Sequence, residues 1–106
     1  MTWTVKLKYT RPNTGVDWHT VSDNAYSNFC DYIDENYNDT GKRISQSLLP
    51  WPTDDEVEMT ATFVYRDEAA AQEHSSDSTV QTYLAARNTY NDANNIIKTV
   101  LQNEET

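Results

Sequence analysis

Cysteine, glycine and positive charge are all scarce in this 106-residue sequence. The single cysteine excludes an internal disulfide and a zinc site built from several cysteines. Gly15 and Gly41 are the only glycines, so there is no glycine-rich loop for binding phosphate groups. With 8 Lys and Arg against 17 Asp and Glu, the net charge of −9 opposes binding to nucleic acid or anionic lipid. We therefore expect neither nucleic acid nor membrane as a direct partner.

Long apolar runs are also missing. The N-terminal segment MTWTVKLKYT lacks the apolar stretch of a signal peptide, and nothing approaches the ~20 apolar residues of a membrane span. The sequence is instead 11% aromatic with seven tyrosines, which is typical of a folded protein rather than an acidic disordered tail. We expect a single domain over residues 1–106, located in the cytosol or in a virion assembled there.

Apolar and polar residues alternate in three segments, which predicts three strands. The clearest are residues 2–10 and 57–66, and a weaker one covers 43–48, with Ile44, Gln46 and Leu48 on one face. The segment PWPTDD, residues 50–55, predicts a turn because its two prolines cannot donate ladder hydrogen bonds. The apolar faces of the two clear strands carry Trp3, Val5, Leu7, Tyr9, Val57, Met59, Ala61, Phe63 and Tyr65.

Two helical stretches separate these strands. The first begins near Ser22 or Asp23, which are suitable N-caps, and ends at Thr40-Gly41. The second begins at Asp67 and is interrupted or capped at SSDS, residues 75–78. The first helix carries an apolar stripe at a 3.6-residue period, formed by Tyr26, Phe29, Cys30, Ile33 and Tyr37.

The segment TYNDANNIIKTV, Thr89 to Val100, decides the topology. One continuous helix from about 79 to 103 would place apolar residues at a coiled-coil spacing. Four Asn and Asp residues between 91 and 95 disfavour a helix interior, and the residues after them are rich in β-branched side chains. We therefore predict a turn at Asn94-Asn95 and a fourth strand at about 96–102.

The resulting order is βαββαβ. Right-handed crossovers then predict a ferredoxin-like α+β fold, with a four-stranded antiparallel sheet in the order 4-1-3-2 and both helices on one face. The other face would be polar, and Lys6 or Lys8 would be placed to pair with Glu58 across strands. That face would carry Thr2, Thr4, Lys6, Lys8, Glu58, Thr60, Thr62 and Arg66.

The passage TGKRISQSLLPWPTDDEVEMTATFVYRDEAAAQEH resembles the middle of ferredoxin-like dimeric α+β-barrel proteins of the antibiotic-biosynthesis-monooxygenase type. The resemblance implies a face-to-face dimer with a cavity between two sheets. Members include cofactor-free oxygenases, haem degraders and many proteins without known activity. His74 matches the helix histidine of the haem degraders, but the first strand lacks their asparagine. The Asn- and Thr-rich composition also resembles small proteins of tailed phages.

The topology brings three connections to one end of the sheet: residues 11–21, 50–55 and 91–95. They carry the candidate partner-binding residues, which are Trp18, His19, Trp51, Asn94 and Asn95. Tryptophan is common at binding hot spots, which favours a partner site. The alternative is that the two tryptophans only cap the core.

Other candidate residues give no catalytic pattern. Cys30 lies on the apolar helix stripe, and His19 and His74 have no metal-ligand spacing, so we expect no metal site and no cofactor. We predict a non-enzymatic protein that acts by self-association or by binding a protein partner, with a phage structural or accessory role as the specific form. The alternatives are a small dimeric oxygenase or isomerase using Trp18, His19 or His74, and an acidic mimic of nucleic acid.

Overall fold

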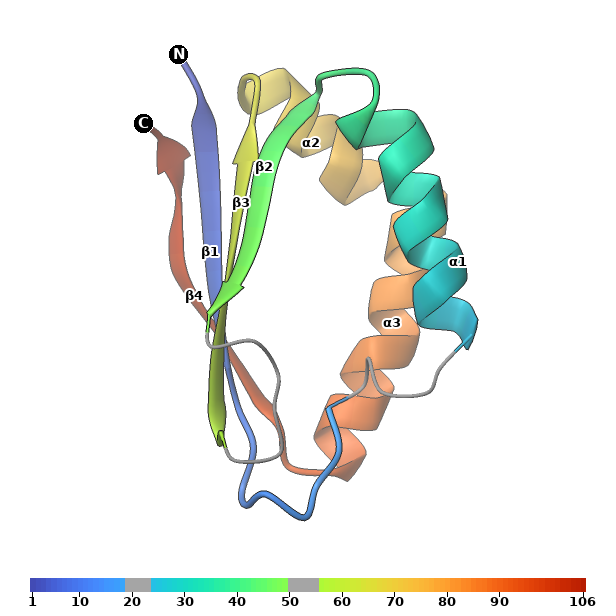
Figure 1. The fold of residues 1–106 in the computed structure, drawn as a ribbon, viewed down its shortest axis with the longest axis vertical. Coiled ribbons are helices and arrows are strands. Elements are labelled where there is room, and N and C mark those ends of the chain that lie inside the picture. Colours follow the sequence, from blue (N-terminus) through green and yellow to red (C-terminus); the bar gives the residue numbers. More distant parts are fainter. Residues whose placement is uncertain (19–23, 50–55) are drawn as a thin grey trace.

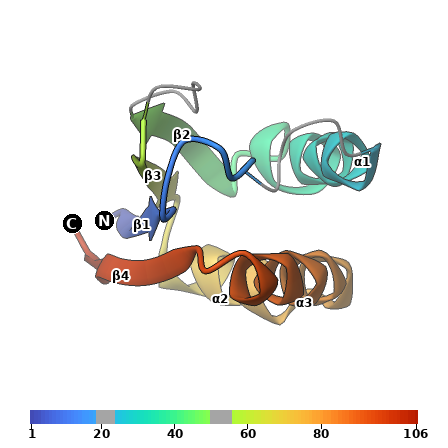
Figure 2. The ribbon, with the colours of Figure 1, turned by 90° about the horizontal axis from the view of Figure 1, so that it is seen from below.

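The fold is an antiparallel sheet covered on one side by helices (Figures 1 and 2). The computed structural model describes residues 1–18, 24–49 and 56–106. Its elements, in chain order, are β1 (Trp3–Thr10), α1 (Asn24–Ile33), the π-helical segment η1 (Asp34–Asn38), β2 (Arg43–Leu49), β3 (Glu58–Tyr65), α2 (Glu68–Ser76), α3 (Ser78–Ala93) and β4 (Ile97–Glu105). The expected N-caps Ser22 and Asp23 lie outside the described residues.

The strand order β2-β3-β1-β4 confirms the predicted ferredoxin-like sheet. β1 pairs antiparallel with both β3 and β4, and β2 pairs antiparallel with β3. The outer face is polar as expected, and Lys8 Nζ lies 4.0 Å from Glu58 Oε1 across the two central strands. The two ends of the described chain meet beside β1, where Thr106 N donates to Thr2 O at 2.9 Å (Figure 1).

The asparagine turn forms where the sequence predicts it, and α3 does not continue through it. Asn94 caps α3, and its side-chain Nδ2 donates to Tyr90 O at 2.9 Å. Asn95 follows with a φ of 58°, in the left-handed region that asparagine tolerates. The chain then reverses into β4, which ends three residues beyond the expected 102.

Asp77 separates α2 from α3 by capping both. Its backbone N–H donates to His74 O at 3.4 Å and so closes α2. Its side chain accepts from Thr79 N at 2.9 Å, which satisfies a free N–H at the start of α3. This double cap explains why the helical stretch breaks at the SSDS segment.

Strand β2 differs from the prediction at its first residues. The register shifts between Arg43 and Ser45, so Arg43 turns toward the helices and Ile44 is left 57% exposed. The expected alternation placed Ile44 inward and Arg43 outward. A bulge inserts one unpaired residue and reverses which face the neighbouring side chain occupies.

The buried core divides into two clusters at opposite ends of the helices. One cluster contains Tyr9, Trp18, Met59 and Ile96, and the other contains Ile33, Tyr37 and Val80. Phe29 and Phe63, which the sequence pattern places in the core, are only partly buried. Their side chains face a space between the two clusters.

Candidate functional site: a cavity between the sheet and the helices

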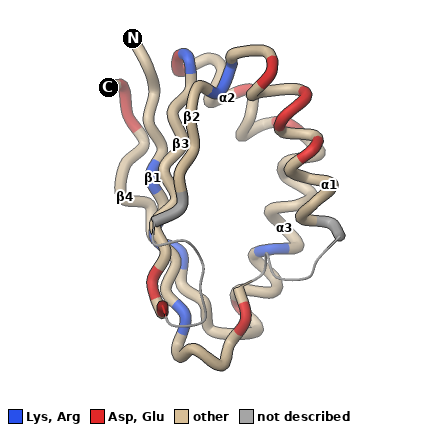
Figure 3. Tube along the Cα trace, in the orientation of Figure 1, with Lys and Arg blue, Asp and Glu red and all other residues tan. Residues whose placement is uncertain are grey.

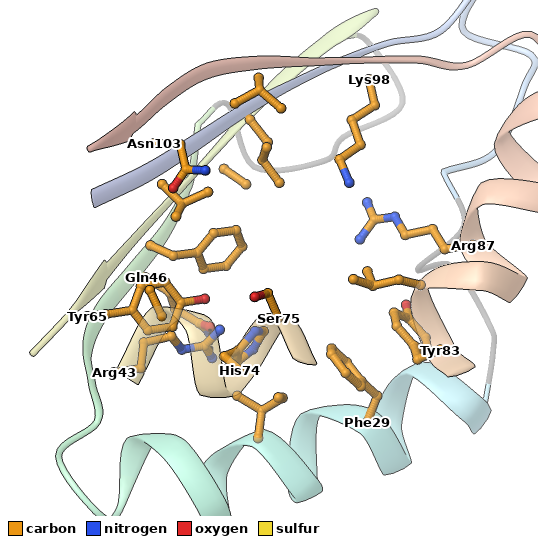
Figure 4. Close-up of a pocket in the computed structure, with 18 of the residues that line it drawn as sticks. Phe29, Arg43, Gln46, Tyr65, His74, Ser75, Tyr83, Arg87, Lys98 and Asn103 are labelled. Carbon is orange, nitrogen blue, oxygen red and sulfur yellow. Dashed lines mark hydrogen bonds between the residues drawn. The ribbon is translucent and has the colours of Figure 1, made fainter. Parts of the chain in front are cut away.

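A cavity of about 600 Å³ lies between the sheet and the helices (Figure 4). Aliphatic and aromatic side chains form most of its surface. The sheet contributes Val5, Leu7, Met59, Ala61 and Phe63, and the helices contribute Phe29, Ile33, Tyr83 and Leu84. Part of the inward face of the sheet therefore meets an unfilled space rather than a closely packed helix.

Two aromatic rings join the helices on the side of the cavity that faces away from the sheet. Phe29 of α1 and Tyr83 of α3 are stacked, with ring centroids 4.1 Å apart and an interplanar angle of 10°. This offset stack holds α1 against α3. The helices thus contact each other while standing away from the middle of the sheet.

Arg43 lies at one end of the cavity, where side chains of the protein hold its guanidinium. It is 7% exposed, and its Nε donates to Asn38 Oδ1 at 2.8 Å. Its Nη2 donates to Gln46 Oε1, and its guanidinium lies 5.3 Å from the centroid of the Phe63 ring. Burial lowers the pKa of Arg43 from its usual value, but these contacts hold the guanidinium in place.

His74 lies beside Arg43 in the cavity wall (Figure 4). Its ring makes edge contacts with Tyr37 at 4.8 Å and Tyr65 at 5.4 Å between centroids. Burial, with the positive charge of Arg43 as a second cause, lowers the pKa of His74 to about 4. His74 is therefore neutral near pH 7. Its Nε2 is buried and accepts or donates no hydrogen bond among the described residues.

Arg87 and Lys98 lie at the other end, where their charged groups point toward one another across the cavity (Figure 4). The Arg87 guanidinium lies 4.4 Å from the centroid of the Tyr9 ring, so a buried aromatic side chain fixes it. Burial, with repulsion from Arg87 as a second cause, lowers the pKa of Lys98. Neither residue forms an ion pair with residues 1–18, 24–49 or 56–106.

The charge of the cavity is opposite to that of the chain. Three of the eight Lys and Arg residues line it, namely Arg43, Arg87 and Lys98, against two of the 14 acidic residues that the structure describes, Asp34 and Glu68. Most of the acidic residues lie elsewhere, as the red segments along α1 and near the C-terminus in Figure 3 show. A protein with a net charge of −9 thus has a cavity wall with an excess of positive charge.

The residues predicted to bind a partner do not share one environment. Trp18 is 3% exposed and packs with Tyr9, Met59 and Ile96, so it caps the core. Asn94 and Asn95 form the turn after α3, and Asn95 is exposed. The other two predicted residues, His19 and Trp51, lie outside the described residues.

Described residues beside these connections lie close together, whereas residues 50–55 themselves lie outside the described part of the chain. Arg11 Nε donates to Glu56 O at 2.7 Å, which joins the segment after β1 to the segment before β3. Tyr90 OH donates to Asp17 O at 2.6 Å, which joins the same segment to the end of α3. Ile96, after the asparagine turn, packs against Trp18 in the core.

The cavity is not evident from the sequence, although several residues that the sequence pattern places in the core line it. The sequence pattern predicts that Phe29, Cys30 and Phe63 are ordinary core residues. They line a cavity because the helices stand away from the sheet at these positions. One signal was present: Lys98 occupies an inward position of β4, between the outward Ile97 and Thr99. A charged residue at an inward strand position is unusual unless it meets a partner.

In the part of the chain that the structure describes, no group of three or more His, Cys, Asp or Glu residues is placed to hold a metal ion. No described helix is long and apolar enough to cross a membrane.

No protein-family model and no curated protein matches the sequence. Among solved structures, a dimeric ferredoxin-like protein from an uncultured marine organism has a TM-score of 0.49 at 9% identity, over 94% of each chain. A protein of unknown function from Nitrosomonas europaea has a TM-score of 0.44 at 17% identity, over 100% of this chain and 95% of the other. The strand order itself identifies the fold: this chain is a ferredoxin-like α+β protein.

Proposed function

We propose that this protein binds a small, mostly apolar molecule in the cavity between the sheet and the helices. The volume of the cavity, about 600 Å³, is the observation that carries the proposal. Ligand pockets occupy roughly 300–1,000 Å³ and are lined mainly by apolar and aromatic side chains. Protein interiors otherwise pack closely and leave few voids larger than a water molecule. An apolar space of this size is therefore suited to an occupant.

The cavity supports binding better than catalysis. His74 is the lining residue best suited to act as a general base, because histidine usually titrates near neutral pH. With a pKa of about 4 it is a weak base at neutral pH, since catalytic bases work best when their pKa lies near the working pH. The neutral ring instead forms part of the cavity wall.

Binding of N-phenyl-1-naphthylamine, a neutral apolar dye that fluoresces in apolar surroundings, tests the proposal. The wild-type protein should bind the dye saturably. Ala61→Trp should abolish binding, because Ala61 is 2% exposed and lines the cavity, so the indole would fill it. Ala69→Trp is the matched control, because Ala69 is exposed on α2 and does not line the cavity. Equal dye binding by both variants would place the dye elsewhere and contradict the proposal.

Self-association is a second candidate function, supported by the free edge of the sheet. β4 is an edge strand, and Ile97 and Leu101 on it are 63% and 50% exposed. An exposed edge strand with apolar side chains is a template for pairing with another chain. The composition, which resembles that of small tailed-phage proteins, makes a phage particle the setting in which we would look for such an assembly.

Sedimentation equilibrium of two variants would locate the contact. If copies pair through β4, Leu101→Lys should yield monomers, whereas Thr62→Lys on the outer sheet face should not. If copies associate face to face, as dimeric α+β barrels do, Thr62→Lys should be the disruptive change. A monomeric wild-type protein would exclude both arrangements.

A further inference from the structure

Arg87 and Lys98 form a pair of like charges that the described chain leaves uncompensated. They come from different elements, α3 and β4, yet their charged ends point toward one another and into the same end of the cavity (Figure 4). The stack on Tyr9 holds Arg87 in that direction, and its Nε is buried without a hydrogen-bond partner among the described residues. Such a pair is unfavourable by itself, because like charges that point toward one another repel.

Arg43, the third cation of the cavity, differs in this respect. Its Nε and Nη2 donate to the side-chain oxygens of Asn38 and Gln46, and the residue is 7% exposed, so it is less available to a ligand. Arg87 and Lys98 therefore mark the end of the cavity at which a negative group would be bound. Between the two ends lie apolar side chains, including Leu7, Phe63 and Leu84.

We propose that the ligand is an apolar molecule with one anionic group, such as a carboxylate, sulfonate or phosphate, which Arg87 and Lys98 bind together. The inference rests on the proposed binding function and adds the chemical class of the ligand. The anion lies between the guanidinium and the ammonium group, and the apolar body extends along the sheet toward Phe63. Bound in this way, the anion removes the repulsion between the two cations.

Two dyes that share an apolar body test the anionic group alone. 8-Anilinonaphthalene-1-sulfonate carries a sulfonate, whereas N-phenyl-1-naphthylamine has the same ring system without it. The wild-type protein should bind the sulfonate roughly tenfold more tightly than the neutral dye, because hydrogen bonds to a charged group are stronger than neutral ones.

Two variants and a control test whether Arg87 and Lys98 cause the preference for the sulfonate dye. Lys98→Met and Arg87→Met should each reduce the preference for the sulfonate by roughly tenfold while the neutral dye still binds. Lys6→Met is the matched control, because it removes the same charge from the opposite face of the sheet, and the preference should stay at the wild-type value. Lys98 is an exposed residue, so Lys98→Met is expected to fold even if Arg87→Met does not.

The outcomes separate this inference from the function on which it rests. If the neutral dye binds and the sulfonate binds no more tightly, the cavity function stands and the anionic ligand is excluded. A preference that survives Lys98→Met, or that Lys6→Met lowers equally, would also overturn the assignment. If neither dye binds, both proposals fail.

Discussion

Tyr37 and Asp77, 40 residues apart in the sequence, are joined by a 2.7 Å hydrogen bond from the Tyr37 hydroxyl to Asp77 Oδ2. Tyr32 donates to the same oxygen at 2.6 Å. Burial alone would raise the pKa of Asp77, but the hydrogen bonds from Tyr32 and Tyr37 outweigh it and lower the pKa. One carboxylate thus connects α1 and η1 to the junction between α2 and α3.

The first prediction concerns the pH dependence of that link. A carboxyl group whose pKa is lower in the folded state stabilises the fold above its unfolded pKa, near 3.8, and this contribution is lost as the pH falls through the folded value. Asp77→Asn should therefore cost about 1–2 kcal/mol at pH 7, through the weakened cap and hydrogen bonds.

Urea unfolding at pH 7 and at pH 3 measures the effect. The difference between Asp77→Asn and wild type should shrink at pH 3. Asp31→Asn is the control, because Asp31 is an exposed residue of α1 and its removal reports only the loss of one negative charge. A variant with wild-type stability at pH 7 would show that Asp77 does not hold the helices together.

His74 should make the protein less stable between about pH 6.5 and pH 4. Its pKa is lowered to about 4 by burial and by Arg43, so in this range the unfolded chain binds a proton that the folded protein excludes. The free energy of unfolding should decrease as the pH is lowered from about 6.5 to 4. His74→Gln should flatten that dependence. The measurement is urea unfolding of both proteins at half-unit pH steps. Parallel curves for the two would contradict the assignment.

Core substitutions should separate the filled clusters from the cavity. Ile33 is 1% exposed, so Ile33→Ala should cost about 2–5 kcal/mol through lost transfer energy and a new void. Phe63 already faces the cavity, so Phe63→Ala in the ligand-free protein should cost clearly less than the ~3–5 kcal/mol of a buried phenylalanine. Chemical denaturation gives both values. A loss at Phe63 equal to that of a filled core would mean that the cavity closes in solution.

The turn after α3 provides a backbone test. Asn95 has a φ of 58°, which alanine adopts at a cost and glycine does not. Asn95→Ala should lower stability by about 1 kcal/mol, whereas Asn95→Gly should leave it near the wild-type value. Thermal melts of the two variants make the comparison. Equal melting temperatures would show that the positive φ is not retained in solution.

Trp51 tests the predicted partner surface, although it lies outside the described residues. If it contacts a partner or a second copy, Trp51→Ala should weaken that association by about 2 kcal/mol or more and leave the melting temperature nearly unchanged. If it caps the core, the reverse pattern is expected. Sedimentation combined with thermal melts distinguishes the two.

The fold was predictable because local chemistry agrees with it at each decisive position. The alternation in β1 and β3 sets their inward faces, and the asparagines at 94 and 95 end α3 where the β-branched residues of β4 begin. The register of β2 was not predictable, because a bulge that turns Arg43 inward leaves no mark in the order of polar and apolar residues.

The candidate site was harder to predict from the sequence than the fold. The spacing of apolar residues along an element is the same whether their side chains pack against another layer or line a cavity, as Phe29 and Phe63 illustrate. The pairing of Arg87 with Lys98 depends on how far α3 stands from β4, which no spacing within one element encodes. The sequence alone shows only that Lys98 is a cation within the predicted fourth strand.

The space between the two layers also determines how the molecule responds to hydrostatic pressure. Internal volume that disappears on unfolding makes the unfolded state smaller in solution, so pressure favours it in proportion to the void that is lost. A protein of 106 residues with about 600 Å³ between sheet and helices is therefore expected to unfold at a lower pressure when the space is empty. A bound molecule would fill that volume and raise the pressure needed to unfold the same fold.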